Sequence, residues 1–404
     1  MHCDLNNFYA SVEIATNKEL GGKPVIVSGD PENRHGIVLA KNQLAKNCNI
    51  KTGDTVYMAK QKCPNLVAVP PHFAKYVAYS KQVFEIYSRY TDRIEQFGID
   101  ECWLDVTNSV KLFGSGKKIA DELRKTVRKE CNLTISVGVS FTKAFAKLGS
   151  DLKKPDATTV IDKQNYKLVA WPLPVGDLIM VGKRTEKKLN ELGVFTIGDL
   201  ARASHEIFRE KFGIVGVNLI NTALGVDKDE VKLADEITLP KSVSNGTTTK
   251  NDMQTFEEAQ IIVYALSDLI AYRLRKLGMN CNGVGVSYKF NDFTSDSRGE
   301  KTPFATDSST DIAKFALKIL KERVNFALKP LRAITVYTYY LKENKIGIQT
   351  TIEAKDVKKN KKIDDAIDKI KTKYGYNSIV RGVLVGNDIN SHLHAEDDFK
   401  PFQR

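Results

Sequence analysis

Strand-like and helix-like stretches alternate through the first 165 residues, and this alternation restricts the fold more than any other feature of the chain. Two stretches, 75–90 and 115–130, carry apolar residues at helical spacing. Five short runs rich in β-branched and aromatic residues are typical of strands, namely 24–28, 37–40, 92–99, 102–106 and 133–139. Apolar residues repeat about every 3.6 residues in a helix and every second residue in a strand, so the two kinds of element can be distinguished. They predict an α/β core for this part of the chain.

The following segment, 172–225, is helical with short loops. Glycines punctuate this segment, among them Gly182, Gly193, Gly198, Gly213 and Gly216. Glycine commonly marks turns and helix ends. After Gly225 comes a polar stretch, 228–235, which we interpret as a linker.

A second unit follows the linker. Apolar residues recur at helical spacing in 259–274 and again in 312–320. Strand-like runs lie around them, at 241–249, 282–289, 300–305 and 333–340. The order β-α-β-β-α-β predicts a two-layer α+β module. In the tail, we expect the basic run 355–362 to be a solvated linker. An amphipathic helix should follow, with an apolar side formed by Ile363, Ala366, Ile367 and Ile370. The end of the tail should be loose.

Length and charge narrow the class of protein. A chain of 404 residues with 42% hydrophobic and 27% charged residues is long enough for two to four globular domains. Sixty-one Lys and Arg residues against 49 Asp and Glu residues give a net charge of +12. Such an excess often accompanies a polyanionic partner, although lysine-rich solvated faces produce it too. Nucleic acid is therefore one candidate partner.

Membrane, secretory and disulfide-rich classes are not indicated. No run reaches the roughly 18 apolar residues of a membrane span, and Asp4 stands where a signal peptide would be cationic and then apolar. The six cysteines are scattered without a C-x-x-C pair, so neither a zinc site nor a disulfide framework is predicted. We expect a cytoplasmic protein.

Acidic residues flanked by apolar runs suggest a metal site. Asp4 ends a very short apolar start, and Asp100 and Glu101 lie between two strand-like runs. Adjacent carboxylates in apolar surroundings repel each other and lose hydration, and a divalent cation would relieve both costs. Oxygen ligands without His or Cys favour Mg²⁺ or Mn²⁺. The alternative is an exposed hairpin turn with ordinary acids, and Asp105 nearby could be a structural cap.

Several short motifs follow one another along the first half of the chain, namely DLNNFYASVE at 4–13, GIDECWLDVT at 98–107, SVGVS at 136–140 with Lys143, Ala146 and Lys147, DLKKP at 151–155, and IMVGKRT at 179–185. In this order they resemble the sequence motifs of the Y-family translesion DNA polymerases, in particular the bacterial DNA polymerase IV-like and the plasmid- or phage-type members. The resemblance extends over about residues 1–343.

This resemblance implies a multidomain α+β fold shaped like a right hand, with palm, small fingers, helical thumb and a β-α-β-β-α-β little finger. The palm would comprise 1–15 and 73–165, with the fingers at 16–72. The thumb would be 166–230, and the rest would divide into a linker (231–240), the little finger (241–343) and a C-terminal tail (344–404). With these parts assigned, only the short tail is left, so no proofreading nuclease is expected.

The resemblance also implies the chemistry. Asp4, Asp100 and Glu101 would hold two Mg²⁺ ions, with Mn²⁺ as a substitute, and the backbone carbonyl of Leu5 would complete one site. The reaction would join a deoxynucleoside triphosphate to a primer 3′-hydroxyl by phosphoryl transfer. It would be template-directed, of low fidelity and able to bypass lesions.

Nucleotide-binding residues are implied in the same way. The ring of Tyr9 would fill the space that a ribose 2′-hydroxyl requires, while Phe8 would be a packing residue; the alternative is that both are core aromatics. Asn7, Phe8 and Tyr9 enter a helix whose N–H groups would face the triphosphate. Lys154 matches a phosphate-binding lysine. Lys46 stands where the family usually has arginine, and a lysine keeps the charge but lacks the bidentate guanidinium group. Gln43 stands where the family usually has tyrosine. Asn6 stands where many members have an acidic residue.

DNA contacts are implied for the thumb and the little finger. Val181, Gly182, Lys183 and Arg184 resemble a helix-hairpin-helix that grips the DNA backbone without reading sequence, the alternative being a plain helical hairpin capped by Gly182. Basic residues of the C-terminal module, such as Arg273, Lys289 and Arg332, would follow duplex phosphates. A clamp-binding segment would lie around Gln349, although the usual leucine and aromatic positions are missing. We expect a monomer.

Two other functions stay open. A nucleotidyl cyclase on a related palm would explain the acids but not the basic module. A noncatalytic DNA-binding scaffold derived from a polymerase would be compatible with the changes at Gln43 and Lys46.

Overall fold

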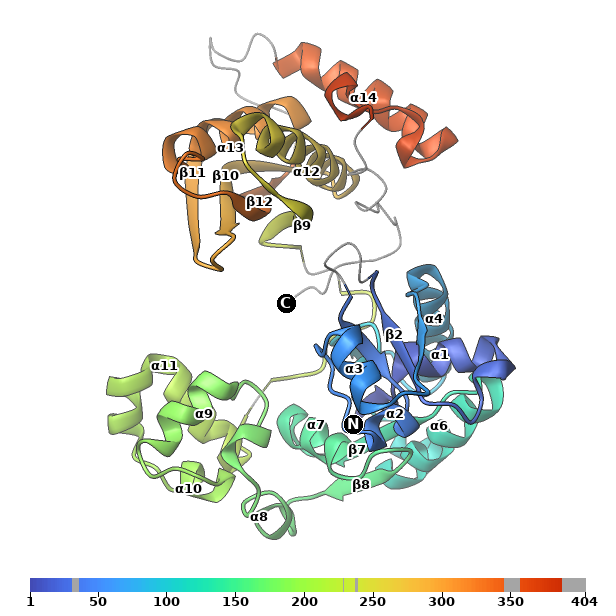
Figure 1. Cartoon of the computed structure of the whole chain (residues 1–404). Helices are drawn as coiled ribbons and strands as arrows, with labels where there is room; N and C mark the ends of the chain where they lie inside the picture. The colour runs from blue at the N-terminus through green and yellow to red at the C-terminus, as the bar shows by residue number, and fades with distance from the viewer. Residues whose placement is uncertain (31–35, 228, 237–238, 345–356, 387–404) are drawn as a thin grey trace. The chain divides into compact units, whose positions relative to one another are not determined.

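The computed structural model describes residues 1–30, 36–227, 229–236, 239–344 and 357–386, which form two compact units (Figure 1). The first unit comprises 1–29 and 36–236, and the second begins at 239. None of the helices in these ranges is both long enough and apolar enough to cross a membrane.

A five-stranded sheet is the centre of the first unit, in the order β5-β6-β1-β7-β8. Neighbouring strands are antiparallel except for the parallel pair β7 and β8. The strands are β1 (His2–Leu5), β5 (Ile94–Gln96), β6 (Glu101–Leu104), β7 (Ile135–Ser140) and β8 (Thr158–Ile161). Helices of this part are α1 (Phe8–Thr16), α4 (Phe73–Ser88), α5 (Val110–Phe113), α6 (Gly116–Cys131) and α7 (Lys143–Leu152).

The two faces of this sheet are covered differently. Cys3, Leu5 and Leu104 belong to a core cluster that also contains residues of α4 and α6, such as Ile86 and Ile119. On the opposite face α7 contacts β1, β7 and β8. A Cβ at Gly138 on β7 would overlap the carbonyl of Ala146, so glycine is what lets α7 lie this close to the sheet.

Residues 17–29 and 36–72 form a smaller layer with a three-stranded sheet in the order β3-β2-β4. Its elements are η1 (Lys18–Leu20), β2 (Val25–Ser28), β3 (Val38–Lys41), α2 (Gln43–Asn47), α3 (Val56–Lys62) and β4 (Val67–Val69). A separate core cluster, which includes Ile26, Val38 and Ile50, holds these elements together.

Short helices follow, with a core of their own that also takes in Phe145 and Ile161. They are α8 (Tyr166–Val169), η3 (Val175–Asp177), α9 (Lys183–Asn190), α10 (Ile197–Ala201) and α11 (His205–Leu224). Helix α11 is kinked at Gly213, whose φ is 64°.

The polar stretch expected to be a linker is partly fixed to the sheet. The amide of Ala234 donates to the carbonyl of Asp92 at 2.9 Å, and the amide of Lys232 donates to the Glu95 carboxylate at 3.1 Å. Glu95 also pairs with the buried Lys143, which contacts Asp229 at 3.0 Å. Residues 229–234 therefore run beside the edge strand β5, where unpaired strand groups are usually protected.

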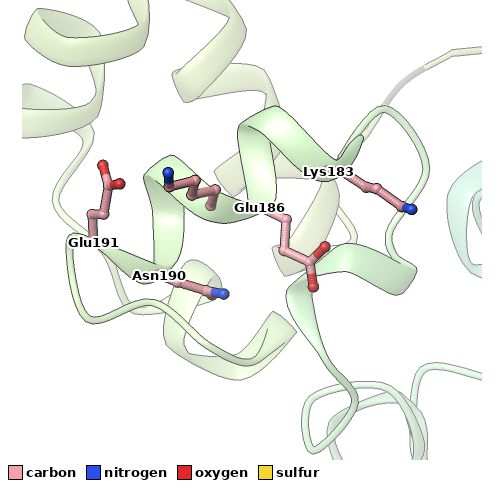
Figure 2. A pocket seen from close by; sticks show the side chains of 5 residues that line it. Lys183, Glu186, Asn190 and Glu191 are labelled. Carbon is pink, nitrogen blue, oxygen red and sulfur yellow. The ribbon is translucent and has the colours of Figure 1, made fainter.

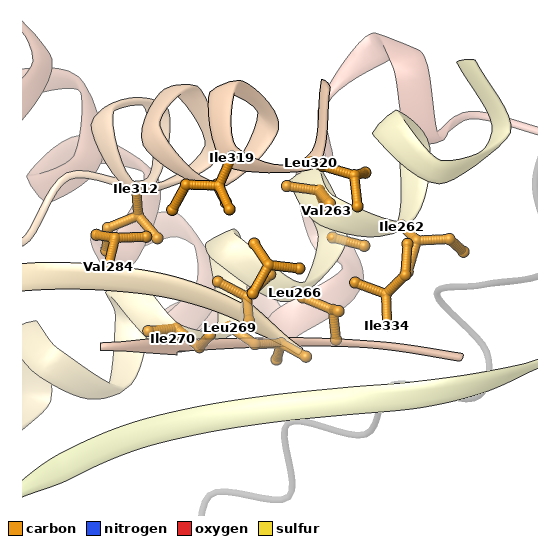
Figure 3. Close-up of a cluster of buried hydrophobic side chains, with 14 of the residues drawn as sticks. Ile262, Val263, Leu266, Leu269, Ile270, Val284, Ile312, Ile319, Leu320 and Ile334 are labelled. Atoms are coloured by element: carbon orange, nitrogen blue, oxygen red, sulfur yellow. The ribbon is translucent and has the colours of Figure 1, made fainter. Parts of the chain in front are cut away.

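The second unit is a four-stranded antiparallel sheet, β11-β10-β12-β9, with α12 and α13 packed on it. Its apolar core lies between helices and strands (Figure 3). The elements are β9 (Ser242–Met253), α12 (Phe256–Lys276), β10 (Met279–Phe290), β11 (Ser295–Thr306), α13 (Ser309–Arg323) and β12 (Leu331–Glu343). The predicted β-α-β-β-α-β order is confirmed.

The tail differs from the expectation. Helix α14 (Val357–Tyr374) begins within the basic run, so residues 357–362 are helical and not a linker. The helix faces the module with polar residues: Asp368 makes a bidentate ion pair with Arg275 at 2.6 and 2.8 Å. Ile363 and Ile370 of the predicted apolar stripe are exposed instead. After α14 come η5 (Tyr376–Ser378) and η6 (Gly382–Leu384). The segment expected to be loose lies mainly outside the described residues.

Candidate active site

Register brings two of the predicted acids together. Asp4 on β1 is the partner of Glu101 on β6. The amide of Leu5 donates to the carbonyl of Asp100 at 3.0 Å, which makes Leu5 and Asp100 a hydrogen-bonded pair. Pairs alternate in an antiparallel ladder, so Asp4 and Glu101 form the non-hydrogen-bonded pair, in which side chains lie closest. The three acids therefore lie at one end of the two central strands.

Burial and mutual repulsion make this cluster costly when ionised. Burial raises the pKa of Asp4 to about 7 against the opposing attraction of Lys154, and the charges of Glu101 and Asp100 add to the rise. Burial, followed by repulsion from Glu101, raises the pKa of Asp100 to about 6. Burial acts on Glu101 too, but hydrogen bonds from His2 and Lys147 outweigh it and lower the pKa of Glu101 to about 2.

Two lysines supply positive charge to the acids. The Nζ of Lys154 lies 2.6 Å from Oδ2 of Asp4 and 2.8 Å from Oδ1 of Asp151. The Nζ of Lys147 lies 2.6 Å from Oε2 of Glu101. Within the described part of the chain, no three Asp, Glu, His or Cys side chains are already arranged as a metal site. The donors nevertheless fit a hard divalent cation, because they are carboxylates with surplus negative charge that ammonium groups now balance.

Supporting contacts around the acids were not predicted from the sequence. His2 is fully buried beside Glu101, with its Nε2 3.4 Å from Oε2 of Glu101 and its Nδ1 2.8 Å from the Ser150 hydroxyl. The Ser150 hydroxyl donates to the carbonyl of Lys147. His2 lies two residues before Asp4, on the same face of β1, and that alternation is the signal that could have identified it.

Asn6, which replaces an acid found in many relatives, has a structural role. Its side chain is buried and donates to the Ser136 hydroxyl at 2.9 Å. Its Oδ1 accepts from the Thr134 hydroxyl at 3.1 Å and from the amide of Asp156 at 2.8 Å. Asn6 thus ties β1 to β7 and to the turn after Lys154.

The aromatic pair at the start of α1 consists of one buried ring and one ring nearer the surface. Asn7, at φ 52°, turns the chain into α1. Phe8 is buried, whereas Tyr9 is half-buried and stacks on Tyr76 with ring centroids 4.2 Å apart. Burial and the charge of Asp100 raise the pKa of Tyr9 to about 12, so the Tyr9 side chain lies near the acidic cluster.

The remaining predicted residues lie apart from the acids. Lys46 is exposed on α2. Partial burial of Lys41 lowers the pKa of Lys41, and the nearby charge of Lys46 lowers it further. Val181 is buried in the core of the helical segment, and Gly182 is the residue before α9, with Lys183 and Arg184 exposed in its first turn. Lys183 lies beside an open hollow of about 410 Å³, which is lined also by Glu186, Lys187, Asn190 and Glu191 (Figure 2).

Comparison with known proteins agrees with the motifs and the topology. The impB/mucB/samB family matches residues 3–151, and the impB/mucB/samB family C-terminal domain matches residues 240–352. The chain is 44% identical to a DNA polymerase IV of Acetivibrio thermocellus over 95% of its own length and 97% of that protein. It is 33% identical to DNA polymerase IV 2 of Bacillus subtilis, covering 94% of this chain and 92% of that one.

Solved structures share the fold. A Y-family DNA polymerase chimera superposes with a TM-score of 0.75 at 23% identity, over 85% of this chain and 99% of that one. DinB from Sulfolobus solfataricus superposes with a TM-score of 0.55 at 24% identity, over 84% of this chain and 97% of that one. Motifs, topology and relatives thus agree that this chain belongs to the Y family of DNA polymerases.

Proposed function

We propose that this chain is a template-directed DNA polymerase of the translesion type, which adds deoxynucleotides to a primer 3′-hydroxyl with low fidelity and without proofreading. The observation that carries the proposal is the meeting of Asp4, Asp100 and Glu101 at one end of two paired strands. Family membership and relatives named DNA polymerase IV support it. The members of this family use divalent metal ions.

The acids would bind metal ions, and Lys154 would bind the phosphate of the incoming nucleotide. Asp4, Asp100, Glu101 and the carbonyl of Leu5 would hold two Mg²⁺ ions, for which Mn²⁺ can substitute. Bound there, divalent ions supply Lewis-acid stabilisation to phosphoryl transfer. Lys154 and Lys147 now neutralise Asp4 and Glu101. With divalent ions bound to the acids, Lys154 would be available to bind a phosphate oxygen of the incoming nucleotide.

The start of α1 and the adjacent rings would select the nucleotide. Asn7 and Phe8 begin the helix, and its free N–H groups favour an anion. Tyr9 would exclude a ribose 2′-hydroxyl by occupying its space. Lys46 would add charge on the side of α2 without the two-pronged geometry of arginine.

Primer-template DNA is the proposed partner, with Val181, Gly182, Lys183 and Arg184 at the phosphate backbone. Residues 1–15 and 73–165 would be the palm, 16–72 the fingers, 166–230 the thumb, 231–240 the linker and 241–343 the little finger, followed by the tail 344–404. We further propose a cytoplasmic monomer. The proposed clamp segment around Gln349 lies outside the described residues.

Primer extension tests the proposal. Wild-type protein should extend a primed template with Mg²⁺, also past an abasic site, and Asp100→Ala and Glu101→Ala should abolish extension while retaining DNA binding. A matched control is Asp121→Ala, which removes an acid that pairs with Lys117 on the surface of α6. Binding without any extension under Mg²⁺ or Mn²⁺ would show a noncatalytic scaffold, and a cyclic product formed from triphosphates without DNA would show a cyclase.

A further inference from the structure

A buried carboxylate lies behind the acidic cluster and takes no part in the chemistry described above. Glu13 is on α1, one helical turn after Tyr9, and only 4% of its side chain is exposed. Its Oε1 accepts a hydrogen bond from the Tyr76 hydroxyl at 2.6 Å and lies 2.9 Å from Nδ1 of His72. Lys75 approaches its other oxygen at 3.8 Å. A buried carboxylate with this many partners fixes the groups around it.

Tyr76 connects this carboxylate to Tyr9. Its ring is fully buried on α4 and stacks on the ring of Tyr9 at 4.2 Å, with an angle of 11° between the planes. Phe73 meets both tyrosine rings edge-on, at 6.0 and 5.9 Å. The Tyr9 ring therefore stacks on one ring and meets a second ring at nearly a right angle.

Steric exclusion works only if the excluding ring cannot move away. A 2′-hydroxyl could be accommodated by a small displacement of Tyr9, so discrimination depends on how firmly the ring is held. Stacking alone lets one ring slide over another, since offset arrangements are close in energy. The hydrogen bond from the Tyr76 hydroxyl to Glu13 prevents Tyr76 from sliding, and Tyr76 in turn limits Tyr9.

We propose that Glu13 and Tyr76 are positioning residues for sugar selection: Glu13 anchors Tyr76, and Tyr76 holds the plane of the Tyr9 ring against an incoming nucleotide. The inference rests on the proposed function, in which Tyr9 excludes ribonucleotides. Neither residue needs to touch the nucleotide. The substrate class that the pair selects is the deoxynucleoside triphosphate.

The ratio of kcat/KM for a deoxynucleotide to kcat/KM for the matching ribonucleotide measures this role. Tyr76→Phe keeps the stacked ring and removes the hydroxyl, so the ratio should fall about three- to tenfold, the value of one hydrogen bond. Glu13→Ala should lower it similarly. Glu13→Gln keeps an acceptor oxygen for the Tyr76 hydroxyl and should largely restore the ratio.

A matched control distinguishes positioning from general stability. Tyr90→Phe removes another tyrosine–glutamate hydrogen bond of the same unit, to Glu122 at 3.1 Å. It should leave the ratio unchanged even if it lowers the melting temperature. A fall in the ratio as large as that of Tyr76→Phe would overturn the inference.

Two further outcomes distinguish a failure of the role proposed for Glu13 and Tyr76 from a failure of the role proposed for Tyr9. If Tyr9→Ala does not change the ratio, the proposed role of Tyr9 is wrong. If Tyr9→Ala lowers the ratio but Tyr76→Phe does not, Tyr9 excludes ribonucleotides without this support and the inference is wrong. In the double variant Tyr9→Ala with Tyr76→Phe, the second change should have no further effect, because its target is gone. Should Glu13→Ala fail to fold, Tyr76→Phe alone decides.

Discussion

At the scale of single residues, the site is a group of acids kept in place at a cost. Asp4 is buried, and its pKa is raised from the ordinary 3.8 to about 7, so between these pH values the folded chain favours a proton there that the unfolded chain has released. Lys154 reduces this cost without removing it. Such a position is poor for stability and suitable for capturing a cation.

We predict that Asp4→Asn stabilises the protein at high pH in the absence of divalent ions. The ordinary pKa of Asp is 3.8 and the folded value is about 7, so the folded state binds more protons between these values. Stability of the wild-type protein should therefore fall as pH rises through this window, with the full penalty above pH 7. Urea unfolding in a chelator at pH 4 to 8.5 would show the variant gaining on the wild type only as pH rises.

Asp121→Asn is the control of opposite sign. Although burial acts against it, hydrogen bonding to Lys117 and further partners lowers the pKa of Asp121, so its contribution to stability is present at neutral pH and lost in acid. The Asn variant should be less stable than wild type at pH 7 and equal to it in acid. A constant difference between Asp4→Asn and wild type at every pH would contradict the electrostatic account of the site.

The acids of the site were predictable because they lie in short ordered motifs. Asp4, Asp100 and Glu101 belong to segments whose order and spacing resemble one family. Glu13, inside the same first segment, has no visible role in the sequence, because its partners His72 and Tyr76 lie about 60 residues away on another helix. Contacts between distant segments were therefore the part that the sequence could not supply.

At the scale of elements, the close contact of α7 with β7 positions Lys147 beside Glu101. A Cβ built on Gly138 would lie 1.8 Å from the carbonyl oxygen of Ala146 and 2.6 Å from the amide nitrogen of Ser150. Backbone atoms cannot move aside as flexible side chains can. Lys147 and Ser150 are on α7 and contact Glu101 and His2, so a shift of this helix would disturb the acidic cluster.

We predict that Gly138→Ala destabilises the first unit by about 3 kcal/mol or more, because the added methyl group forces α7 away from the sheet. Chemical denaturation followed by tryptophan fluorescence would measure it. Gly182→Ala is the matched control: a Cβ there meets no heavy atom within 4 Å, and φ is −83°. It should change stability by less than about 0.5 kcal/mol. Equal losses from both variants would contradict the packing argument.

Periodicity predicted the longer elements well and the shorter ones poorly. Helices α4, α6, α12 and α13 lie where apolar spacing indicated them. The three- and four-residue strands β4 and β8 were not predicted, since runs that short carry little pattern. For helix α14, the sequence predicted that the isoleucines would pack against the module. Instead, Asp364 and Asp368 face α12, because both form ion pairs with Arg275.

At the scale of the whole molecule, the chain consists of two units with separate cores. The described part of the tail, 357–386, belongs to the second unit. Arg381 pairs with Asp268 on α12 at 2.9 Å, and Lys371 lies 3.9 Å from the centroid of the Tyr376 ring. Leu384 is 3% exposed and joins the core cluster of the second unit. Residues 376–384 are therefore a structural part of this unit.

We predict that Leu384→Ala destabilises the second unit by about 2–4 kcal/mol, the usual cost of removing a buried leucine side chain, and leaves the first unit unchanged. Both tryptophans, Trp103 and Trp171, lie in the first unit, so their fluorescence reports on that unit alone. Far-UV circular dichroism reports on both. During denaturation, the circular dichroism component of the second unit should shift to lower urea while the fluorescence transition stays in place.

The neighbouring Val385→Ala is the control, because Val385 is 68% exposed and should shift neither signal. If Val385→Ala and Leu384→Ala behaved alike, the tail would not be anchored through Leu384; if the fluorescence transition moved as well, the two units would not unfold independently.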